Sequence, residues 1–433
     1  MTVRYQADAV VTCNRDFDIH RPGVVDVDQE GRLAWVGPAD HAPPHVGEEL
    51  ALAGLLMPGL INCHCHSAMT LFRGATEDIP LERFLKEVLW PREARLTEED
   101  VYWGMTLACS ELLRFGVTTS CEMYFFEEAQ LRAVLEAGFR SLITPGILEV
   151  PGLFTWKEML ERVVGFCDRH AGRHQLVEIG LGAHSAYTVP PDGLRAVAEA
   201  ALERDALVHI HVAETQAEGR PIEEEYGVTV PRLLADLGVL EARVVAAHSI
   251  WLTDDDLRIY QEHDVGVAHC PQSNAKLASG IARLADMLEL GLRVGLGTDG
   301  PSANNDLDLW EEMRLAPLLA RLQTGDAARV SAREALRLAT RGGAEALGRP
   351  DLGALEPGRW ADMVLLDLSD SAFVPEVEEH DLVSHLVWSA SSRLVTDVWV
   401  AGRRVVEEGR CLTVDEERAR DEVDQRARRL ARA

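Results

Sequence analysis

The sequence has very little lysine and an excess of acidic residues. Lysine occurs at only three of 433 positions, Lys86, Lys157 and Lys276, so arginine supplies the other 40 of the 43 basic residues. Asp and Glu together number 71, which gives a formal net charge of −28. Because nucleic acids and anionic membranes attract cationic surfaces, this balance argues against either one as a partner.

Long hydrophobic runs and paired cysteines are also scarce. No apolar run is long enough to cross a bilayer, and residues 1–8 lack the basic segment and apolar core of a signal peptide. The eight cysteines form no CxxC pair, and a chain of this length can bury an adequate core without disulfides. We therefore expect a soluble, cytoplasmic protein with reduced thiols.

Short strand-like runs alternate with helical periodicity between residues 58 and 350. Helical patterns such as 193–204 and 253–262 separate them, and Thr253 is a candidate N-cap with Asp256 three residues on. Eight strands alternating with helices predict an α/β fold, a (β/α)8 barrel of the TIM type; the strand count disfavours the alternative, a doubly wound open sheet. The predicted strands are 60–66, 116–124, 140–148, 177–187, 206–214, 243–250, 265–271 and 293–300.

The two ends of the chain differ from this pattern. Residues 1–57 and 352–411 contain short β-like runs separated by turn signals such as Val36-Gly-Pro. We expect them to form one small β-sandwich domain beside the barrel of residues 58–351. The last segment, 412–433, is rich in charge and predicts a helix on the surface.

The segment Pro58-Gly-Leu-Ile-Asn-Cys-His-Cys-His is the strongest indication of function. On a strand, residues i and i+2 share a face, so His64 and His66 can reach the same metal ion. Neutral imidazole is the commonest metal ligand, although a single His-x-His is weak evidence. Alternation turns Cys63 and Cys65 to the opposite face, which indicates that these two residues belong to the core and are not ligands.

Five of the eight predicted strands end in a His or an Asp, at the face of a barrel where active sites lie. We interpret His64, His66, His211 and Asp299 as ligands of one divalent ion, and these ligand types favour zinc. His209 shares the face of His211 one layer deeper, and we interpret it as a barrel-core residue. None of the three lysines lies on a predicted strand, which argues against a dinuclear site bridged by a carboxylated lysine.

Glu214, His248 and Asp299 are the candidate catalytic residues. A water bound to a divalent ion has a lowered pKa and becomes a nucleophile near neutral pH. Glu214, three residues after His211, is placed to move the protons; the alternative is a surface carboxylate that opens the next helix. His248 would hydrogen-bond the attacking hydroxide or the developing tetrahedral centre. Together these residues predict a metal-dependent hydrolase.

With these residues identified, the chain resembles the amidohydrolase superfamily, and within it the 5′-methylthioadenosine/S-adenosylhomocysteine deaminases and their chlorohydrolase relatives. The resemblance runs nearly from end to end and implies a mononuclear metal site, a small-molecule substrate and a homo-oligomer. The matching blocks are Met57-Pro-Gly-Leu-Ile-Asn-Cys-His-Cys-His-Ser-Ala-Met-Thr-Leu-Phe-Arg-Gly, His211-Val-Ala-Glu-Thr, Cys270-Pro-Gln-Ser-Asn-Ala-Lys-Leu-Ala-Ser-Gly, Gly297-Thr-Asp-Gly-Pro-Ser-Ala-Asn-Asn and Glu356-Pro-Gly-Arg-Trp-Ala-Asp-Met-Val.

The resemblance also implies which residues contact the substrate. Glu93 matches a carboxylate that grips the ribose hydroxyls in that family; without the family, a solvated helix residue is an equal alternative. His184 matches a histidine on the substrate side of the site. Phe84 or Trp90 matches an aromatic residue that packs near the base.

One departure from the family concerns the 5′ end of the substrate. Members that accept adenosylhomocysteine resemble one another in an arginine just after the third strand, and the matching place here is Pro145, which cannot make a charged contact. The loop that follows offers Phe154, Trp156 and Lys157. These residues suit an apolar or aryl-carboxylate 5′ group, or alternatively form a lid packed on the barrel.

The expected reaction is hydrolytic deamination of the 6-amino group of a 5′-modified adenine nucleoside. Methylthioadenosine, 5′-deoxyadenosine and aminodeoxyfutalosine are favoured over adenosylhomocysteine. A guanine or oxidised-purine deaminase and a triazine-type chlorohydrolase or aminohydrolase are alternatives with the same site. A non-catalytic scaffold is disfavoured because every expected ligand is present, and the Pro-Cys-x-x-Cys run of zinc deaminases that act on nucleic-acid bases is absent.

Overall fold

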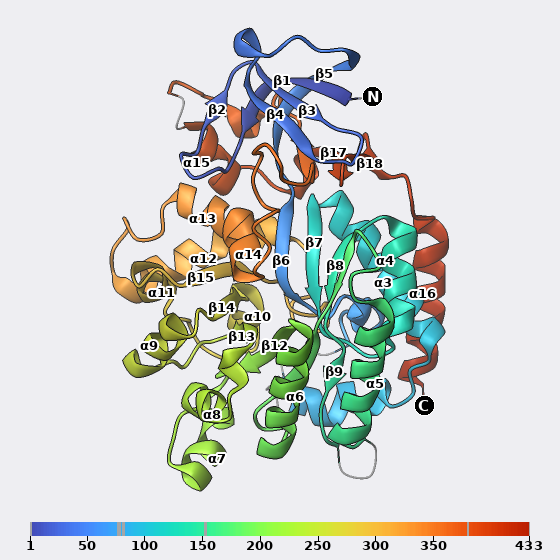
Figure 1. The fold of residues 1–433 in the computed structure, drawn as a ribbon, viewed down its shortest axis with the longest axis vertical. Helices are drawn as coiled ribbons and strands as arrows, with labels where there is room; N and C mark the ends of the chain where they lie inside the picture. The colour runs from blue at the N-terminus through green and yellow to red at the C-terminus, as the bar shows by residue number, and fades with distance from the viewer. Residues whose placement is uncertain (1, 76–78, 80–82, 151–153, 379–380, 433) are drawn as a thin grey trace.

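The computed structural model describes residues 2–75, 79, 83–150, 154–378 and 381–432. Its strands form two sheets, one of ten strands in the centre and one of nine strands above it in Figure 1. Within the described residues no helix is long and apolar enough to cross a membrane.

The ten-stranded sheet is a closed parallel barrel. β8 and β9 are two halves of one barrel strand, interrupted at Thr144 and Pro145, and β10 and β11 are two halves of the next, interrupted at Gly180. Pairing of Leu296 with Asn62 closes the ring between β15 and β6, so the predicted eight-stranded barrel is confirmed. Its strands are β6 (Leu60–Cys65), β7 (Val117–Glu122), β8 (Arg140–Ile143), β9 (Gly146–Ile147), β10 (Val177–Ile179), β11 (Leu181–Ser185), β12 (Leu207–Val212), β13 (Arg243–His248), β14 (Gly266–His269) and β15 (Arg293–Leu296).

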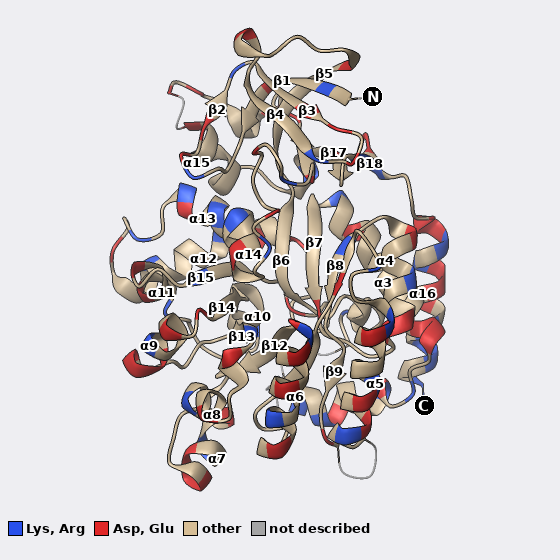
Figure 2. Cartoon of the chain, viewed as in Figure 1, with Lys and Arg blue, Asp and Glu red and all other residues tan. Residues whose placement is uncertain are grey.

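Helices surround the barrel and carry most of the charge, whereas β6 and β7 at its centre are nearly uncharged (Figure 2). The two predicted helices are present as α6 and α9, and Thr253 caps α9 in a reciprocal pair with Asp256. The main outer helices are α3 (Glu98–Arg114), α4 (Glu127–Ala137), α5 (Trp156–His170), α6 (Pro191–Arg204), α7 (Gln216–Tyr226), α8 (Val230–Asp236), α9 (Asp254–Glu262), α11 (Leu284–Glu289), α12 (Leu309–Thr324), α13 (Ala332–Ala339) and α14 (Arg341–Ala346).

Strands from both termini form the second sheet, in the order β19-β18-β17-β16-β5-β1-β3-β4 with β2 on β1. The antiparallel pair β5–β16 joins the two termini, which confirms the small β domain and shows that its strands make one continuous sheet. β5 runs directly into β6, so the histidine-bearing strand is anchored in this sheet. The strands are β1 (Thr2–Val11), β2 (Ile19–His20), β3 (Gly23–Val27), β4 (Leu33–Pro38), β5 (Gly47–Pro58), β16 (Met363–Leu366), β17 (Val395–Val400), β18 (Arg403–Glu407) and β19 (Arg410–Cys411).

The last helix, α16 (Glu416–Ala431), lies along α3 at the edge of the molecule (Figure 1). Arg426 and Arg429 pair with the buried Asp100 at the start of α3. α15 (Asp381–Trp388) packs against α13 and α12. The proposed domain division at residues 57/58, 351/352 and 411/412 places α15 with the sheet and α16 in a segment of its own.

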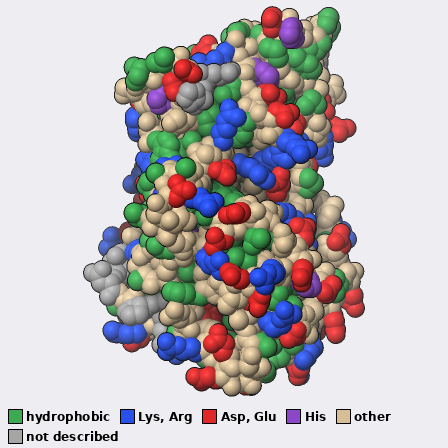
Figure 3. Space-filling model, turned by 90° about the vertical axis from the view of Figure 1, so that its left-hand side faces the viewer, with side chains coloured by type: hydrophobic (Ala, Val, Ile, Leu, Met, Phe, Trp, Pro, Cys, Tyr) green, Lys and Arg blue, Asp and Glu red, His purple; other side chains and the backbone are tan. Residues whose placement is uncertain are grey.

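Acidic and basic side chains are interspersed on the face of the molecule shown in Figure 3. Many of them form exposed ion pairs, such as Arg132 with Glu99 and Arg204 with Asp168. On this face the described residues form no large patch of a single charge sign. This distribution is that of a solvated surface, as the acidic composition predicts.

Candidate active site

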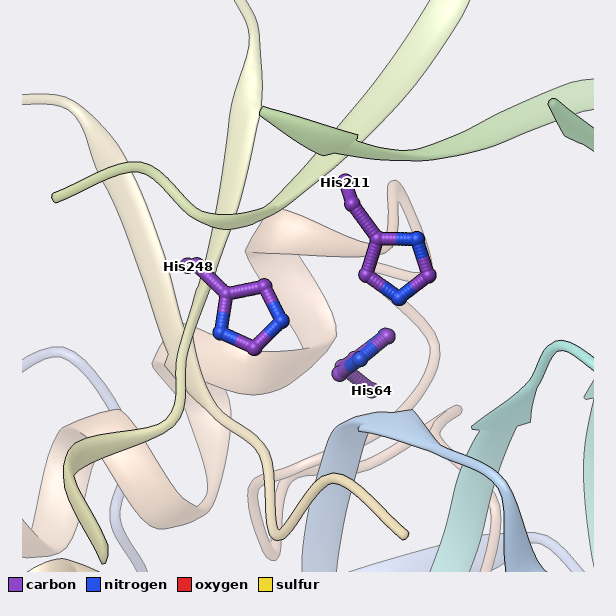
Figure 4. A group of neighbouring side chains, drawn as sticks. All are labelled: His64, His211 and His248. Carbon is purple, nitrogen blue, oxygen red and sulfur yellow. The ribbon is translucent and has the colours of Figure 1, made fainter. Parts of the chain in front are cut away.

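Four of the predicted site histidines meet at the carboxyl ends of the barrel strands. His64 lies near the end of β6, His66 directly follows that strand, His211 lies near the end of β12 and His248 ends β13. The ring centre of His64 lies 4.7 Å from that of His66, 4.8 Å from that of His211 and 5.2 Å from that of His248. Figure 4 shows His64, His211 and His248 directed toward one point.

The four expected ligands are brought together there. Asp299 Oδ1 lies 3.5 Å from His64 Nε2 and 3.3 Å from His66 Nε2, and the Nε2 atoms of His66 and His211 are 3.3 Å apart. Zinc bonds of about 2.0–2.2 Å to nitrogen and oxygen would separate tetrahedral ligand atoms by about 3.3–3.6 Å. The spacing of these atoms therefore fits one metal ion.

Hydrogen bonds on the far side of the rings select the nitrogen that faces the centre. His66 Nδ1 donates to the carbonyl of Met123 at 2.5 Å, and His211 Nδ1 donates to the carbonyl of His184 at 2.6 Å. Since a carbonyl only accepts, Nδ1 of each ring carries the proton of this hydrogen bond, and Nε2 is the nitrogen that faces the other expected ligands. His64 Nε2 is buried and has no hydrogen-bond partner among the described residues. Lone pairs that face one another in a dry interior are costly unless a cation lies between them.

The charge state of the ligands agrees with this arrangement. Burial lowers the pKa of His64 to about 3 and that of His211 well below its usual value, so both rings are neutral at pH 7. Burial alone would raise the pKa of Asp299, but the nearby imidazoles of His64, His66 and His248 lower it. Asp299 is held by Gly300 N, which donates to Oδ1 at 2.7 Å, and by Ser273 Oγ, which donates to Oδ2 at 2.6 Å.

Glu214 and His248 form an acid–base pair beside the ligands, with Glu214 Oε2 3.9 Å from His248 Nε2. Both side chains are buried, so Glu214 is not the surface carboxylate of the alternative interpretation. Burial raises the pKa of the Glu214 carboxyl. Burial alone would lower the pKa of His248, but Glu214, Asp299 and a 2.9 Å hydrogen bond to Asn274 Oδ1 together raise it.

Four of the five residues expected to contact substrate line one cavity beside these groups. Phe84 lies on the π-helix Phe84–Leu89, and Trp90 and Glu93 lie on the short helix α2 (Trp90–Glu93). His184 lies near the end of the fourth barrel strand and also lines the cavity. Burial raises the pKa of Glu93 to about 7, against the effect of a hydrogen bond from Tyr124. The remaining lining includes Met69, Met123, Phe125, Leu148, Tyr187, Leu277, Ser302 and Ala303.

Trp156 is the expected contact that the structure places elsewhere. It begins α5, and its ring packs against Gly193 of α6 instead of lining the cavity. Lys157 lies with its ammonium 5.4 Å from that ring centre. Phe154 remains near the site, because its ring stacks on that of the cavity residue Phe125 at 6.3 Å. Residues 151–153 of this loop lie outside the described residues.

Sequence reasoning missed three functional contacts. The Tyr124 hydroxyl donates to Glu93 Oε1 at 2.8 Å. Tyr124 lies at the end of a predicted strand, and the same kind of position indicated the expected metal ligands. His209, interpreted as a core residue, is buried but hydrogen-bonds His64, one of the expected ligands, at 2.7 Å. Thr144 in turn lies 2.9 Å from His209. Only the closed barrel brings these residues of β6, β12 and the third strand together.

The expected places of the two cysteines beside the histidines are confirmed. Cys63 Sγ points to the backbone of Gly343 on α14, outside the barrel, and Cys65 Sγ lies near Ser67 Oγ at 3.0 Å. Burial raises the pKa of Cys63 and Cys65 far above the range of a reactive thiolate. Both are packing residues of β6.

Comparisons with known proteins agree with this geometry. The profile of the Amidohydrolase family matches residues 55–405. The chain is 41% identical over 428 residues to the 5-methylthioadenosine/S-adenosylhomocysteine deaminase of Pelotomaculum thermopropionicum, with 98% of each chain covered. An adenosine deaminase from Xanthomonas campestris with bound zinc has a TM-score of 0.94 and 32% identity, covering 100% of this chain and 99% of that one. An atrazine chlorohydrolase from Arthrobacter aurescens complexed with zinc has a TM-score of 0.91 and 25% identity, covering 98% of this chain and 100% of that one.

Proposed function

Because this chain belongs to the amidohydrolase family, we propose that it is a metal-dependent hydrolase that deaminates the 6-amino group of a 5′-modified adenine nucleoside and releases ammonia. The observation that carries the proposal is the convergence of the four ligands with Glu214 beside them. The name of the relative at 41% identity supports the substrate class.

His64, His66, His211 and Asp299 would hold the metal ion, and the zinc bound in similar structures and the ligand types favour zinc. When bound, such an ion supplies a water of lowered pKa as nucleophile. Glu214 would accept one proton from the attacking water as the water oxygen adds to C6 of the ring. The same carboxyl would return that proton to the amino nitrogen, the C6–N bond would break and ammonia would leave, and transfer of the remaining proton from the oxygen to ring nitrogen N1 would give the 6-oxo product.

His248 would stabilise the negative charge that develops on the attacking oxygen. Its Nδ1–H donates to Asn274 Oδ1, which directs Nε2 toward the cavity and Glu214. The raised pKa of His248 favours the ring that carries a proton on both nitrogens, so Nε2 can donate to that oxygen. Its left-handed backbone, with φ of 65°, projects the side chain from the strand end.

Glu93 would bind the ribose hydroxyls in the upper part of the cavity. The hydrogen bond from Tyr124 holds one carboxyl oxygen in place and leaves the other oxygen to accept from the substrate. Phe84 and Trp90 would pack near the base, and His184 would contact the substrate from the opposite wall. Burial lowers the pKa of His184 to about 3, so it offers a neutral ring.

A second, mostly apolar cavity adjoins the first and would take the 5′ substituent. The two share Trp90, Glu93, Phe125 and Leu148, and the second is also lined by Phe126, Val150, Phe154 and Met159. Arg162, the one basic residue among the described residues that line it, pairs with Glu127 at 3.1 Å. Pro145 offers no charge either, so an apolar or aryl 5′ group fits better than the charged amino acid of adenosylhomocysteine.

Ammonia release by the zinc-loaded protein tests the proposal. The substrates are adenosine, methylthioadenosine, 5′-deoxyadenosine, aminodeoxyfutalosine, adenosylhomocysteine, guanine and an aminotriazine. We expect one adenosine with an apolar or aryl 5′ group to exceed adenosylhomocysteine. If only guanine or the triazine released ammonia, the proposed substrate class would be wrong. The proposed metal site would not be affected by that result.

Three further expectations from the sequence remain proposals. We propose that the protein is cytoplasmic, that it forms a homo-oligomer, and that it binds neither nucleic acid nor membranes. The net charge of −28 supports the last of these. The resemblance to a family of homo-oligomers supports the second, and sedimentation analysis would test it.

A further inference from the structure

His209 lies directly behind the ligand His64 in the barrel interior. It is on β12, two residues before His211, and it is completely buried. Its Nε2 lies 2.7 Å from His64 Nδ1, and its Nδ1 lies 2.9 Å from Thr144 Oγ1. Thr144 Oγ1 is in turn 2.7 Å from the carbonyl oxygen of Glu122. These contacts form one chain from a backbone carbonyl to a metal ligand.

The direction of every hydrogen bond in this chain follows from its first member. A carbonyl oxygen can only accept, so a 2.7 Å contact with the Thr144 hydroxyl requires the hydroxyl to donate to Glu122. Thr144 Oγ1 therefore accepts from His209 Nδ1–H. A neutral imidazole has a single N–H, so His209 Nε2 must accept from His64 Nδ1–H. The Nε2 of His64 is then left without a proton.

Another polar atom near His209 does not change this direction. Cys121 Sγ lies 3.5 Å from His209 Nδ1, and a thiol is a weak acceptor compared with a hydroxyl oxygen. The deprotonated His64 Nε2 is the same atom that is buried without a hydrogen-bond partner among the described residues. The chain thus aims a lone pair at the point where the other ligands meet.

We propose that Thr144 and His209 are positioning residues that hold His64 in the one tautomer able to bind the metal. This inference rests on the proposed function, because it concerns the metal that the reaction needs. His66 and His211 receive the same restraint directly from the carbonyls of Met123 and His184. His64 receives it through two side chains, so it is the one of these three imidazole ligands whose tautomer a side-chain substitution can release.

Metal affinity of the apoprotein tests the inference without any measurement of turnover. Thr144→Val keeps the shape of the side chain but removes the acceptor for His209. We expect zinc to bind about 10- to 100-fold more weakly, by competition with a chromogenic chelator. Thr144→Ser, which restores a hydroxyl, should recover most of the affinity.

Thr119→Val is the matched control, since Thr119 is a fully buried strand threonine whose hydroxyl has no hydrogen-bond partner among the described residues. It should bind zinc as the wild type does. The unfolding midpoint of each metal-free variant shows whether a change in affinity is a loss of folding. In a His209→Gln background, Thr144→Val should weaken zinc binding no further, because its effect passes through His209.

Wild-type affinity in Thr144→Val, or equal losses in Thr144→Val and Thr119→Val, would overturn the inference and leave the proposed deamination intact. The opposite failure is distinguishable. If the wild type binds zinc and Thr144→Val binds it weakly, yet no nucleoside releases ammonia, the proposed reaction is wrong and the positioning role is supported.

Discussion

Arg140 and His64 lie at opposite ends of the barrel, and both are fully buried. At the amino ends of the strands, Arg140 binds both oxygens of Asp362 at 2.7 and 3.0 Å and donates to the carbonyl of Gln175. Asp362 also accepts from the backbone N–H of Ala401. At the carboxyl ends, His64 Nδ1 hydrogen-bonds His209. His64 Nε2 has no hydrogen-bond partner in the described part of the chain.

This difference in hydrogen bonding distinguishes the structural ion pair of Arg140 from the candidate site at His64. A buried guanidinium with each of its nitrogens hydrogen-bonded joins the barrel to the terminal sheet and has its counterion within the protein. A buried nitrogen without a partner is costly and is retained where a ligand completes it.

The largest effect is expected at the metal end, from His211→Ala. Removing one of the ligands should abolish zinc binding and deamination together, as measured by metal analysis of the purified protein and ammonia release. His41→Ala, at an exposed histidine, is the control and should behave as the wild type does. Full metal occupancy in His211→Ala would refute its role as a ligand.

Glu214→Gln separates proton transfer from metal binding at the same end of the barrel. The variant should keep its zinc but lose about 10²- to 10⁴-fold in kcat, because the amide cannot carry the proton from water to the leaving nitrogen. Glu224→Gln, on the exposed side of α7, should leave kcat unchanged. Normal turnover in Glu214→Gln would remove Glu214 as the proton shuttle.

Asp362→Ala tests the structural end. It leaves the buried guanidinium of Arg140 without its anion, and we expect a loss of about 3–5 kcal/mol in the free energy of unfolding. Activity per folded molecule should not change, because the site lies at the other end of the strands. Asp424→Ala breaks the exposed pair with Arg428 and should barely move the denaturant midpoint. A lower kcat at full folding would show that the two ends are coupled.

The smallest effect is expected from Glu93, through the pH dependence of substrate binding. Its raised pKa of about 7 means that Glu93 gains a proton as the pH falls below 7, and the neutral acid is a weaker acceptor for the ribose hydroxyls. For adenine nucleosides, kcat/KM should therefore fall below pH 7, whereas free adenine should show no such fall. Glu93→Gln should lower kcat/KM about 10- to 100-fold and remove this pH dependence. An unaltered pH profile would exclude Glu93 as the ribose contact.

The sequence was most informative where the signal is local. His64 and His66 share a face because a strand has a two-residue period, and the ends of parallel strands meet at one rim whatever packs around them. The eight strands, Thr253 as a cap and the approach of His211 and Asp299 to His64 all follow from such rules. The family assignment rests on the same contiguous blocks of sequence.

Tertiary structure decided what depends on neighbours that are distant in the chain. From the sequence, the aromatic side chain of Trp156 was expected to contact the substrate. In the structure α5 packs on α6, and the Trp156 ring lies against Gly193 instead. His209 and His211 are alike in the sequence, yet one contacts a ligand from behind and the other is itself a proposed ligand, because they occupy different layers of the barrel. Thr144 gains its role only from the break in its strand and from the residues across the ring. The sequence alone thus determined which chemical groups reach the rim. Closure of the barrel decided which nitrogen each group presents there, since hydrogen-bond direction depends on partners that no local pattern records.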